Sequence, residues 1–335
     1  CLMALDTSLI EIFENITSKA ALASYHFVGK KDKIAADKAA VDVLRDLLNK
    51  VEIQGKIVIG EGELDEAPML YIGEKVGTGK GLEIDIAVDP LEGTNFAANN
   101  LPGALSVLAV AEKNNLFHAP ETYMNKIAVG SNIPKDAIDL DNPLKKNIFN
   151  LADCKKKDIT QLTACLLDRP RHKKIIDELN ELKVNLKLIS DGDVSGALLV
   201  SNERYGVDIF MGIGGGPEGV LAAAALDAYN CLFQGRFIFK EEKDILRAKK
   251  MGIKELNKKY ELNEIVSGDS IFCATGITNG DLVKGIKIVD NTYTSETLVT
   301  HKNSNTKKII RRTEKITSWF QSPRKYGVKE KYHKD

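Results

Sequence analysis

Short apolar stretches followed directly by acidic residues constrain this chain more than any other feature of its sequence. Residues 55–60 (GKIVIG), 84–88 (IDIAV), 185–189 (NLKLI) and 207–213 (VDIFMGI) have the length and composition of buried or half-buried strands. Helical periodicity separates several of these stretches. Alternating strands and helices predict an α/β protein whose sheets carry helices on their faces.

The order of these patterns suggests two parts. Apolar residues recur at helical spacing over 5–26 and 31–50, and strand and helix patterns alternate from 162 to 229. Loop signals at 141–143 and 155–157 then predict an N-terminal part over 1–155 and a C-terminal part over 156–318. Residues 319–335 are expected to form a basic surface tail.

Charge and cysteine usage exclude several classes of protein. The chain has zero formal net charge, but its last 35 residues carry eleven Lys or Arg against three Asp or Glu, which leaves the preceding 300 residues net acidic. An acidic body argues against nucleic acid as a partner. No apolar run approaches the roughly 20 residues of a membrane span, and without a basic-then-apolar pattern no signal peptide is expected. Five cysteines without a C-x-x-C pair suit a reducing compartment, so a cytoplasmic location is expected.

The acidic residues follow the predicted strands at the points where these end. Glu61 follows the first stretch, Asp89 and Glu92 the second, Asp191 and Asp193 the third, and Glu218 opens a helix after the fourth. Carboxylates beyond strand ends share the crevice of an open sheet, and their mutual repulsion favours a bound cation. Oxygen ligands favour Mg²⁺ or Mn²⁺ over Zn²⁺. A single such Asp is more often a turn residue or helix N-cap, so the prediction depends on recurrence.

The hexapeptide 89–94 (DPLEGT) is the strongest of these signals. Pro90 fixes one backbone angle and Gly93 permits close backbone approach. Asp89 and Glu92 could then share a metal pair, with the Thr94 hydroxyl beside it. Spacing alone predicts a turn that binds divalent metal and leaves the reaction open.

At these residues the sequence resembles the lithium-sensitive, metal-dependent phosphatases, whose signature is D-P-x-D/E-G-T. Within that group it is similar to the GlpX-type, class II fructose-1,6-bisphosphatases over about residues 5–315. The blocks that carry the similarity are 57–79, 85–94, 169–172 (RPRH), 191–194 (DGDV), 212–219 (GIGGGPEG) and 274–282 (ATGITNGDL). The resemblance implies a layered αβαβα sandwich with two mixed-sheet subdomains. It also implies hydrolysis of the 1-phosphate of fructose 1,6-bisphosphate in gluconeogenesis, with Mn²⁺ or Mg²⁺, by a homodimer or homotetramer.

Carried over position by position, the resemblance implies a role for each matching residue. One metal would be held by Asp37 and Glu61, and the other by Asp89, Glu92 and Glu218. Substrate would be contacted by Glu92, Gly93, Thr94, Tyr123, Arg169, Pro170, Arg171, Asp191, Gly192, Asp193 and Gly215. The positions linked to catalysis are Thr94, Asp65 and Lys33.

A mechanism with two metals and an activated water suits these roles. The cations would polarise the 1-phosphate and lower the pKa of a bound water. The Thr94 hydroxyl, oriented by Asp65, would position that water for in-line attack. Positioning is favoured over a covalent phosphothreonine because no base that would deprotonate Thr94 is evident. Arg169 and Arg171 would hold phosphates, and Asp191 and Asp193 would accept hydrogen bonds from sugar hydroxyls.

Three alternatives stay open at this point. Residues 214–219 (GGGPEG) match the G-x-G-x-x-G pattern of dinucleotide-binding turns, although Glu218 would repel a pyrophosphate there. The chain could instead be a metal-binding scaffold without activity. Its substrate could also be an inositol phosphate or sedoheptulose 1,7-bisphosphate.

Overall fold

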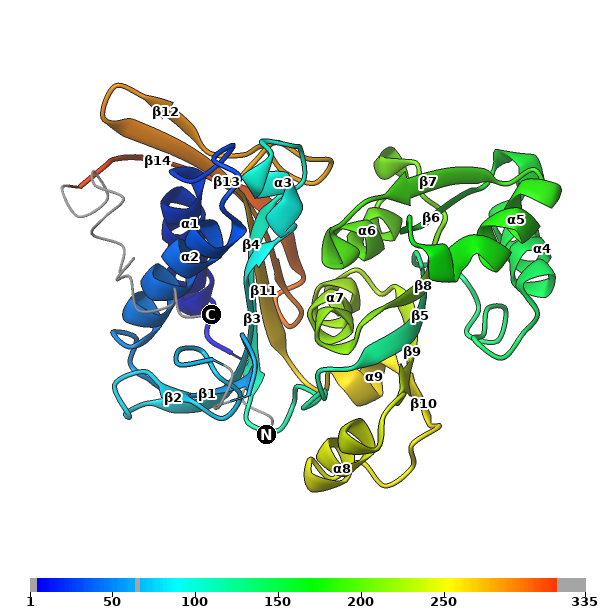
Figure 1. Ribbon diagram of the computed structural model, residues 1–335, viewed down its shortest axis with the longest axis horizontal. Helices are drawn as coiled ribbons and strands as arrows, with labels where there is room; N and C mark the ends of the chain where they lie inside the picture. Colours follow the sequence, from blue (N-terminus) through cyan, green and yellow to red (C-terminus); the bar gives the residue numbers. More distant parts are fainter. Residues whose placement is uncertain (1–4, 64–66, 318–335) are drawn as a thin grey trace. The chain divides into compact units, whose positions relative to one another are not determined.

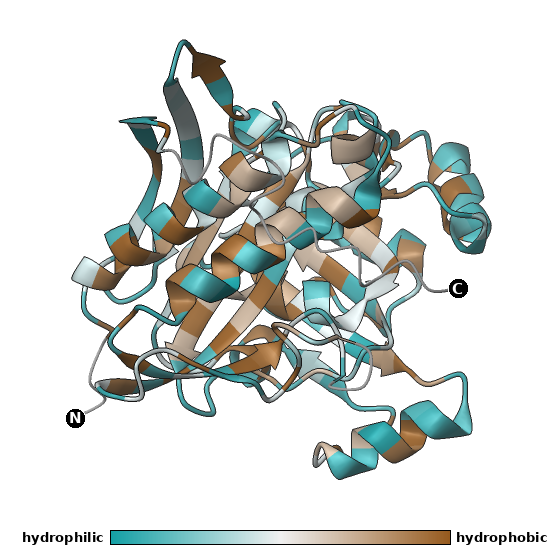
Figure 2. Ribbon diagram, turned by 60° about the vertical axis from the view of Figure 1, so that its left-hand side comes forward, coloured by the Kyte–Doolittle hydropathy of each residue, from teal (hydrophilic) through white to brown (hydrophobic). Residues whose placement is uncertain are grey.

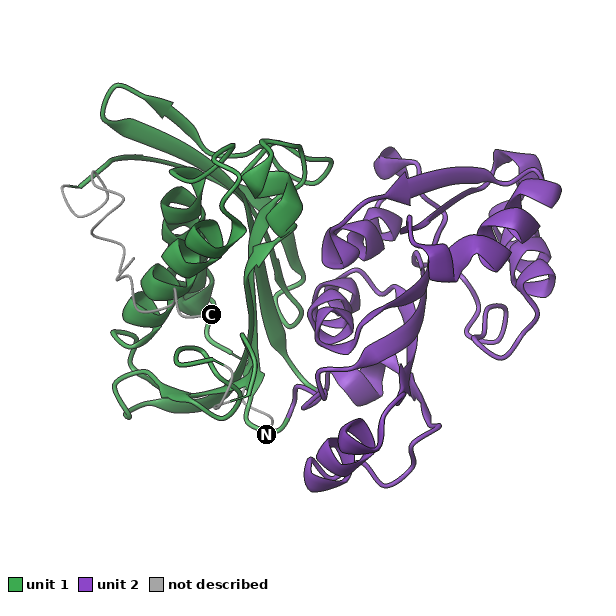
Figure 3. Cartoon of the chain, viewed as in Figure 1, with its two compact units in different colours: residues 1–114, 268–335 green, residues 115–267 purple. Residues whose placement is uncertain are grey.

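The computed structural model describes residues 5–63 and 67–317 of the 335-residue chain. Within these ranges the chain forms two compact units, residues 1–114 with 268–335 and residues 115–267 (Figure 3). The first unit, unit 1, is therefore built from two segments, and the second, unit 2, from one. The boundary expected after residue 155 falls inside unit 2. Local patterns along the chain do not reveal that the C-terminal strands return to the first sheet.

Unit 1 is a mixed sheet of eight strands with helices. Its strand order is β12-β13-β11-β4-β3-β1-β2, with β14 paired to β13, and among the described strands β1 and β3 form its one parallel pair. The elements are α1 (Ser8–Tyr25), α2 (Lys33–Leu48), β1 (Ile53–Ile59), β2 (Lys75–Val76), β3 (Leu82–Glu92), α3 (Thr94–Ala98), β4 (Leu105–Glu112), β11 (Ser270–Gly276), β12 (Lys287–Val289), β13 (Thr292–His301) and β14 (Thr306–Lys315).

The core of unit 1 lies between the sheet and the pair α1 and α2, which lie side by side on one face (Figure 1). Alternate residues of β3, such as Ile84, Ile86 and Val88, face this core and are at most 1% exposed. The helices carry hydrophilic and hydrophobic bands (Figure 2), as helices with one buried side do. The apolar residues thus recur with the strand period of two in the sheet and with the helix period of 3.6 in α1 and α2, which explains why the sheet and these helices pack together.

Unit 2 is a mixed sheet of six strands in the order β10-β9-β5-β8-β6-β7. Strand β6 is parallel to both β7 and β8, and β5 is antiparallel to β8 and β9. The elements are β5 (Tyr123–Val129), α4 (Leu144–Lys155), η1 (Ile159–Gln161), β6 (Thr163–Leu167), η2 (Pro170–His172), α5 (Lys173–Glu181), β7 (Asn185–Ile189), α6 (Asp193–Leu198), η3 (Leu199–Ser201), η4 (Glu203–Tyr205), β8 (Ile209–Gly215), α7 (Gly216–Ala228), β9 (Leu232–Ile238), α8 (Glu242–Lys250), β10 (Lys259–Glu261) and α9 (Leu262–Ile265).

Both faces of the unit 2 sheet are covered. One face packs on α4 and α5 through Ile148, Leu151 and Leu179. Helices α6 and α7 contact β6, β8 and β9. Helix α7 is buried along most of its length, in keeping with its alanine-rich sequence.

The predicted class, two mixed sheets with helices, is confirmed. The strand predicted at 185–189 is β7, and the helices predicted over 5–26 and 31–50 are α1 and α2. The loop signals at 141–143 and 155–157 mark the two ends of α4, a helix that was not predicted. No helix in the part of the chain that the structure describes combines the length and apolar character of a membrane span.

Candidate functional site

A β-bulge places Asp89 and Glu92 on the same side of the unit 1 sheet. Asp89 pairs with Val107 and Glu92 pairs with Leu105, so two residues of β3 stand opposite one residue of β4. In a regular strand, the side chains of two residues that are three positions apart point to opposite faces of the sheet. The extra residue of the bulge shifts this alternation by one, so Asp89 and Glu92 point to the same face. Pro90, which has no N–H to donate to the ladder, lies in this bulge. The bulge in the backbone thus allows both carboxylates to contribute to one site, as predicted from their spacing.

The chain turns sharply after Glu92. Gly93 adopts a left-handed conformation with φ 81°, and a Cβ there would lie 2.7 Å from Cδ2 of Phe96. Glycine is the residue that takes this conformation without strain. Thr94 then begins α3 and is partly exposed, whereas Glu92 is only 4% exposed. A single glycine thus separates Glu92, the last residue of β3, from Thr94, the first residue of α3.

Asp37 and Glu61 form a second pair of carboxyl groups in unit 1. Asp37 lies in α2, whose N-cap Asp32 accepts a hydrogen bond from the Ala35 N–H at 2.9 Å. Burial raises the pKa of Asp37, although a hydrogen bond with the Glu61 carboxyl opposes this shift. Two carboxyl groups can form such a hydrogen bond only when one of them is protonated. The two carboxyl groups therefore lie close together, and their role as ligands of one metal stays a prediction.

The two further positions linked to catalysis have different outcomes. Lys33 is the first residue of α2 and is exposed. Asp65 lies outside the described residues. Its predicted role in orienting Thr94 stays a prediction.

The predicted residues of unit 2 gather at one edge of its sheet. Strands β8, β6 and β7 are neighbours and parallel, so their carboxyl ends lie at the same edge. Arg169 follows β6, Asp191 follows β7, and Gly215 is the last residue of β8. Tyr123 begins the antiparallel strand β5 and pairs with Gly215. The strand ends thus bring these residues to one edge of the unit 2 sheet, and their shared role as a substrate site stays a prediction.

The turn after β7 is shaped by its own side chains. Gly192 has φ 87°, and its N–H donates to Oδ1 of Asp191 at 2.9 Å. Asp193 is the first residue of α6 and is half-buried. The turn therefore presents two carboxylates that are separated by one glycine.

The sequence did not predict the role of Lys126, a buried cation that pairs with Asp193 at this acidic edge. Lys126 lies in the middle of β5, is 2% exposed, and forms an ion pair with Asp193. Burial raises the pKa of Glu218, Lys126 opposes that shift, and Asp193 and Asp191 add to it. A single lysine at an inward position of an apolar strand could have indicated such a buried charge partner.

Carboxylates explain the glycines that end β8. A Cβ on Gly214 would lie 2.3 Å from Oδ2 of Asp193, and a Cβ on Gly215 would lie 1.7 Å from Oε2 of Glu218. The space that a pyrophosphate would need beside this turn is thus taken by acidic groups, which would repel it. The sheet is also mixed, with β5 antiparallel to β8, unlike the parallel sheet of a dinucleotide-binding fold. The dinucleotide alternative is wrong for this turn.

His172 and Arg171 attach the RPRH segment to β8. The Ile213 N–H donates to Nε2 of His172 at 2.8 Å, so the proton is on Nδ1 and donates to the Leu167 carbonyl at 2.7 Å. Nε and Nη2 of Arg171 both donate to the Ile213 carbonyl, at 3.0 and 2.7 Å. The Arg171 guanidinium lies 5.0 Å from the centroid of the Tyr123 ring. Arg169, by contrast, donates to the Asp168 carbonyl at 3.0 Å.

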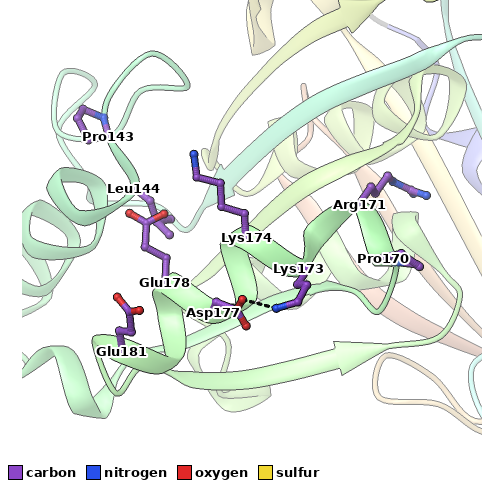
Figure 4. A pocket seen from close by; sticks show the side chains of 9 residues that line it. All are labelled: Pro143, Leu144, Pro170, Arg171, Lys173, Lys174, Asp177, Glu178 and Glu181. Atoms are coloured by element: carbon purple, nitrogen blue, oxygen red, sulfur yellow. Dashed lines mark hydrogen bonds and ion pairs between the residues drawn. The ribbon is translucent and has the colours of Figure 1, made fainter.

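A hollow of about 850 Å³ lies next to this segment (Figure 4). Of the nine residues that line it, Pro170 and Arg171 are predicted site residues, and the others are mainly charged residues of α5. Lys173 and Asp177 form an exposed ion pair there at 2.6 Å. Because its lining includes none of the predicted metal ligands, the hollow is not the centre of the acidic site.

The donor groups suit a hard divalent cation. Glu218 has a buried carboxyl oxygen, Oε2, with no hydrogen-bond partner among the described residues. Such an oxygen is costly without a partner, and a cation would supply one. Within residues 5–63 and 67–317, no three His, Cys, Asp or Glu side chains are grouped closely enough to hold a metal. The predicted ligand set takes four residues from unit 1 and Glu218 from unit 2.

Known proteins resemble this chain over nearly its whole length. The sequence profile of the family described as bacterial fructose-1,6-bisphosphatase, glpX-encoded, matches residues 7–314. The chain is 45% identical over 318 residues to "Fructose-1,6-bisphosphatase 1 class 2" of Escherichia coli (strain K12), covering 91% of this chain and 93% of that protein. It is 43% identical to the class 2 enzyme of Haemophilus influenzae, covering 91% and 94%. It is also 41% identical, covering 88% and 92%, to "D-fructose 1,6-bisphosphatase class 2/sedoheptulose 1,7-bisphosphatase" of Prochlorococcus marinus (strain MIT 9515). The chain belongs to the GlpX-type family of bacterial fructose-1,6-bisphosphatases.

Proposed function

We propose that the protein hydrolyses the 1-phosphate of fructose 1,6-bisphosphate to fructose 6-phosphate and phosphate, a step of gluconeogenesis. The observation that carries this proposal is the bulge in β3, which puts Asp89 and Glu92 on one face immediately before Thr94. Membership of the GlpX-type family supports the reaction and the substrate.

The reaction is proposed to use Mn²⁺ or Mg²⁺. Asp37 and Glu61 would hold one cation, and a second would be held by Asp89, Glu92 and Glu218. When bound, these cations supply positive charge that offsets the charge developing on the phosphoryl oxygens. The raised pKa of Asp37 and the unpartnered oxygen of Glu218 support this assignment.

Thr94 is proposed to position the attacking water. Its hydroxyl lies at the start of α3, on a backbone fixed by the Gly93 turn. Replacement by alanine should lower kcat about 100-fold or more, and replacement by serine should retain most activity, because only the hydroxyl is required. Near-full hydrolysis by Thr94→Ala with metal bound would overturn this role.

Unit 2 is proposed to bind the sugar and its phosphates. Arg171 is oriented by the Ile213 carbonyl and retains N–H groups for a phosphate. Asp191 and Asp193 would accept hydrogen bonds from sugar hydroxyls. The ion pair between Lys126 and Asp193 fixes the direction of one of these acceptors.

Sedoheptulose 1,7-bisphosphate is a second candidate substrate, because the Prochlorococcus relative is named for both activities. Phosphate release should be measured from a panel that contains both bisphosphates, fructose 1-phosphate, inositol 1-phosphate and fructose 6-phosphate, with and without Mn²⁺ and Mg²⁺. We expect the highest kcat/KM on fructose 1,6-bisphosphate and no release without metal. Preference for an inositol phosphate, or no hydrolysis of any member, would reject the proposed function.

A cytoplasmic location and a homo-oligomeric state are part of this proposal. None of the four cysteines in the described ranges forms a disulfide, which suits a reducing compartment. Gel filtration with light scattering would give the oligomeric state directly.

A further inference from the structure

Two cations lie against one exposed aromatic ring at the edge of unit 2. Tyr123 is 40% exposed. The Arg171 guanidinium lies 5.0 Å from its centroid, and Nζ of Lys240 lies 4.9 Å from the same centroid. Like charges held this close to one ring repel each other unless an anion lies near both.

The topology of the sheet accounts for the position of Lys240. Strand β9 is antiparallel to β5, and its last residue, Ile238, pairs with Tyr123. Tyr123 also pairs with Gly215, the last residue of β8. Lys240 therefore leaves the sheet two residues beyond β9, at the edge where the predicted substrate residues of unit 2 gather.

Neither cation is neutralised by a carboxylate among residues 5–63 and 67–317. Two of the five N–H groups of Arg171 donate to the Ile213 carbonyl, which is uncharged. The carboxylate next to Lys240 in sequence, Glu241, pairs with Lys243 at 3.1 Å instead. Arg171 and Lys240 are thus two exposed cations that are held at one ring without a carboxylate partner among the described residues.

We propose that Lys240 is a specificity-determining residue that, together with Arg171, binds the phosphate of the substrate that is not cleaved. This inference rests on the proposed function and deepens it. A guanidinium offers a planar fork to phosphate oxygens and an ammonium adds a compact charge, so the pair matches a dianion. Lys240 is neither a predicted metal ligand nor one of the residues linked to catalysis. We therefore assign its charge to substrate binding and not to the cleavage step.

The test compares substrates that differ only in the second phosphate. Kinetics of the full-length protein with Mn²⁺ would be measured for Lys240→Gln, Lys240→Arg and the control Lys243→Gln, on fructose 1,6-bisphosphate and on fructose 1-phosphate. For Lys240→Gln we expect kcat/KM to fall about tenfold on the bisphosphate, mainly through KM, and to change less than about twofold on fructose 1-phosphate. Lys240→Arg should restore most of the loss, and Lys243→Gln should behave like the wild type.

Binding of fructose 6-phosphate, which carries only the uncleaved phosphate, gives a readout apart from turnover. Its dissociation constant, measured by calorimetry, should rise about tenfold in Lys240→Gln. Equal losses on both substrates, or unchanged values on the bisphosphate and on fructose 6-phosphate, would overturn the role of Lys240 while leaving the proposed function intact. A wild-type protein that hydrolyses neither sugar phosphate would instead reject the proposed function, and this inference with it.

Discussion

Two glycines of this protein are needed for different physical reasons. A Cβ on Gly215 would meet Oε2 of Glu218, the end of a flexible side chain, whereas a Cβ on Gly60 would lie 1.9 Å from the backbone oxygen of Leu70. The first contact can be relieved by moving a carboxylate, and the second requires the backbone to move. The first glycine therefore serves the site and the second serves the fold.

The corresponding alanine variants should separate these roles. Gly215→Ala should keep its free energy of unfolding within about 1 kcal/mol of the wild type, but lose about tenfold or more in Mn²⁺ affinity because Glu218 is displaced. Gly60→Ala should lose at least about 2 kcal/mol of stability. Urea unfolding and calorimetric Mn²⁺ titration would measure both quantities. Unchanged Mn²⁺ binding by Gly215→Ala would contradict the position of Glu218.

Lys126 is the residue whose removal should most disturb the acidic edge of unit 2. Lys126→Met would leave the buried side of Asp193 without its cation, at an expected cost of about 3 kcal/mol in the free energy of unfolding. The double variant with Asp193→Asn should lose less stability than the sum of the losses in the two single variants, because neither charge is then left buried without its partner. Additive losses in metal-free buffer would show that the two residues are not coupled.

At the residue scale, the sequence predicted the acidic residues better than their partners. Asp191, Asp193 and Glu218 were recognisable because each follows an apolar strand in a turn. Lys126 and Lys240 were not predicted: the position of Lys126 in an apolar strand indicates a buried charge, but no local pattern tells which residue either lysine will contact. Their partners are 67 positions away for Lys126 and more than 100 for Lys240 in the chain, so only the folded sheet brings them together.

At the scale of elements, a buried carboxylate connects three segments of unit 2. Asp208 lies just before β8, and its carboxylate accepts hydrogen bonds from Nζ of Lys155 at 2.5 Å and from the Thr163 N–H at 2.8 Å. Burial of the Asp208 carboxyl opposes its ionisation, but these hydrogen bonds outweigh it and hold the pKa below its usual 3.8. Asp208 thereby ties the end of α4 and the start of β6 to β8.

The pH dependence of stability should report this contact. Because the folded-state pKa is lowered, the stabilisation is present above the ordinary pKa of 3.8 and is lost as the pH falls below it. Asp208→Asn should lower the free energy of unfolding by about 1 to 3 kcal/mol at pH 7, and the difference from the wild type should shrink toward pH 3. Urea unfolding at both pH values measures this. A difference that is constant or grows toward pH 3 would contradict the assigned contact.

Elements with strong periodicity were predictable, and those without it were not. Helices α1 and α2 carry apolar residues at helical spacing, and β7 is bounded by turn residues. Helix α4 was not predicted, although the loop signals on either side of it mark its ends: Pro143 is its N-cap residue, and Lys156 is its C-cap residue in a left-handed conformation. The bulge in β3 could not be predicted from spacing alone, because it depends on the pairing with β4.

For the whole molecule, the order of elements in the chain differs from their grouping in space. Strands β11 to β14 follow unit 2 in sequence but complete the sheet of unit 1, where β11 pairs with β4. Pairing across more than 150 positions leaves no pattern within any window of the sequence. The predicted metal ligands are likewise drawn from both units, so activity should require the whole chain.

We propose that carboxylates at strand ends serve a metal-dependent hydrolysis of one phosphate of a sugar bisphosphate. The most direct measurement is ³¹P NMR of fructose 1,6-bisphosphate incubated with the protein after chelation of its metals and again after addition of Mn²⁺. After chelation we expect no change in the spectrum. After Mn²⁺ is added, we expect loss of the 1-phosphate signal, with fructose 6-phosphate and inorganic phosphate as the products. Hydrolysis that persists in the chelator, or loss of the 6-phosphate instead, would rule out this role of the carboxylates.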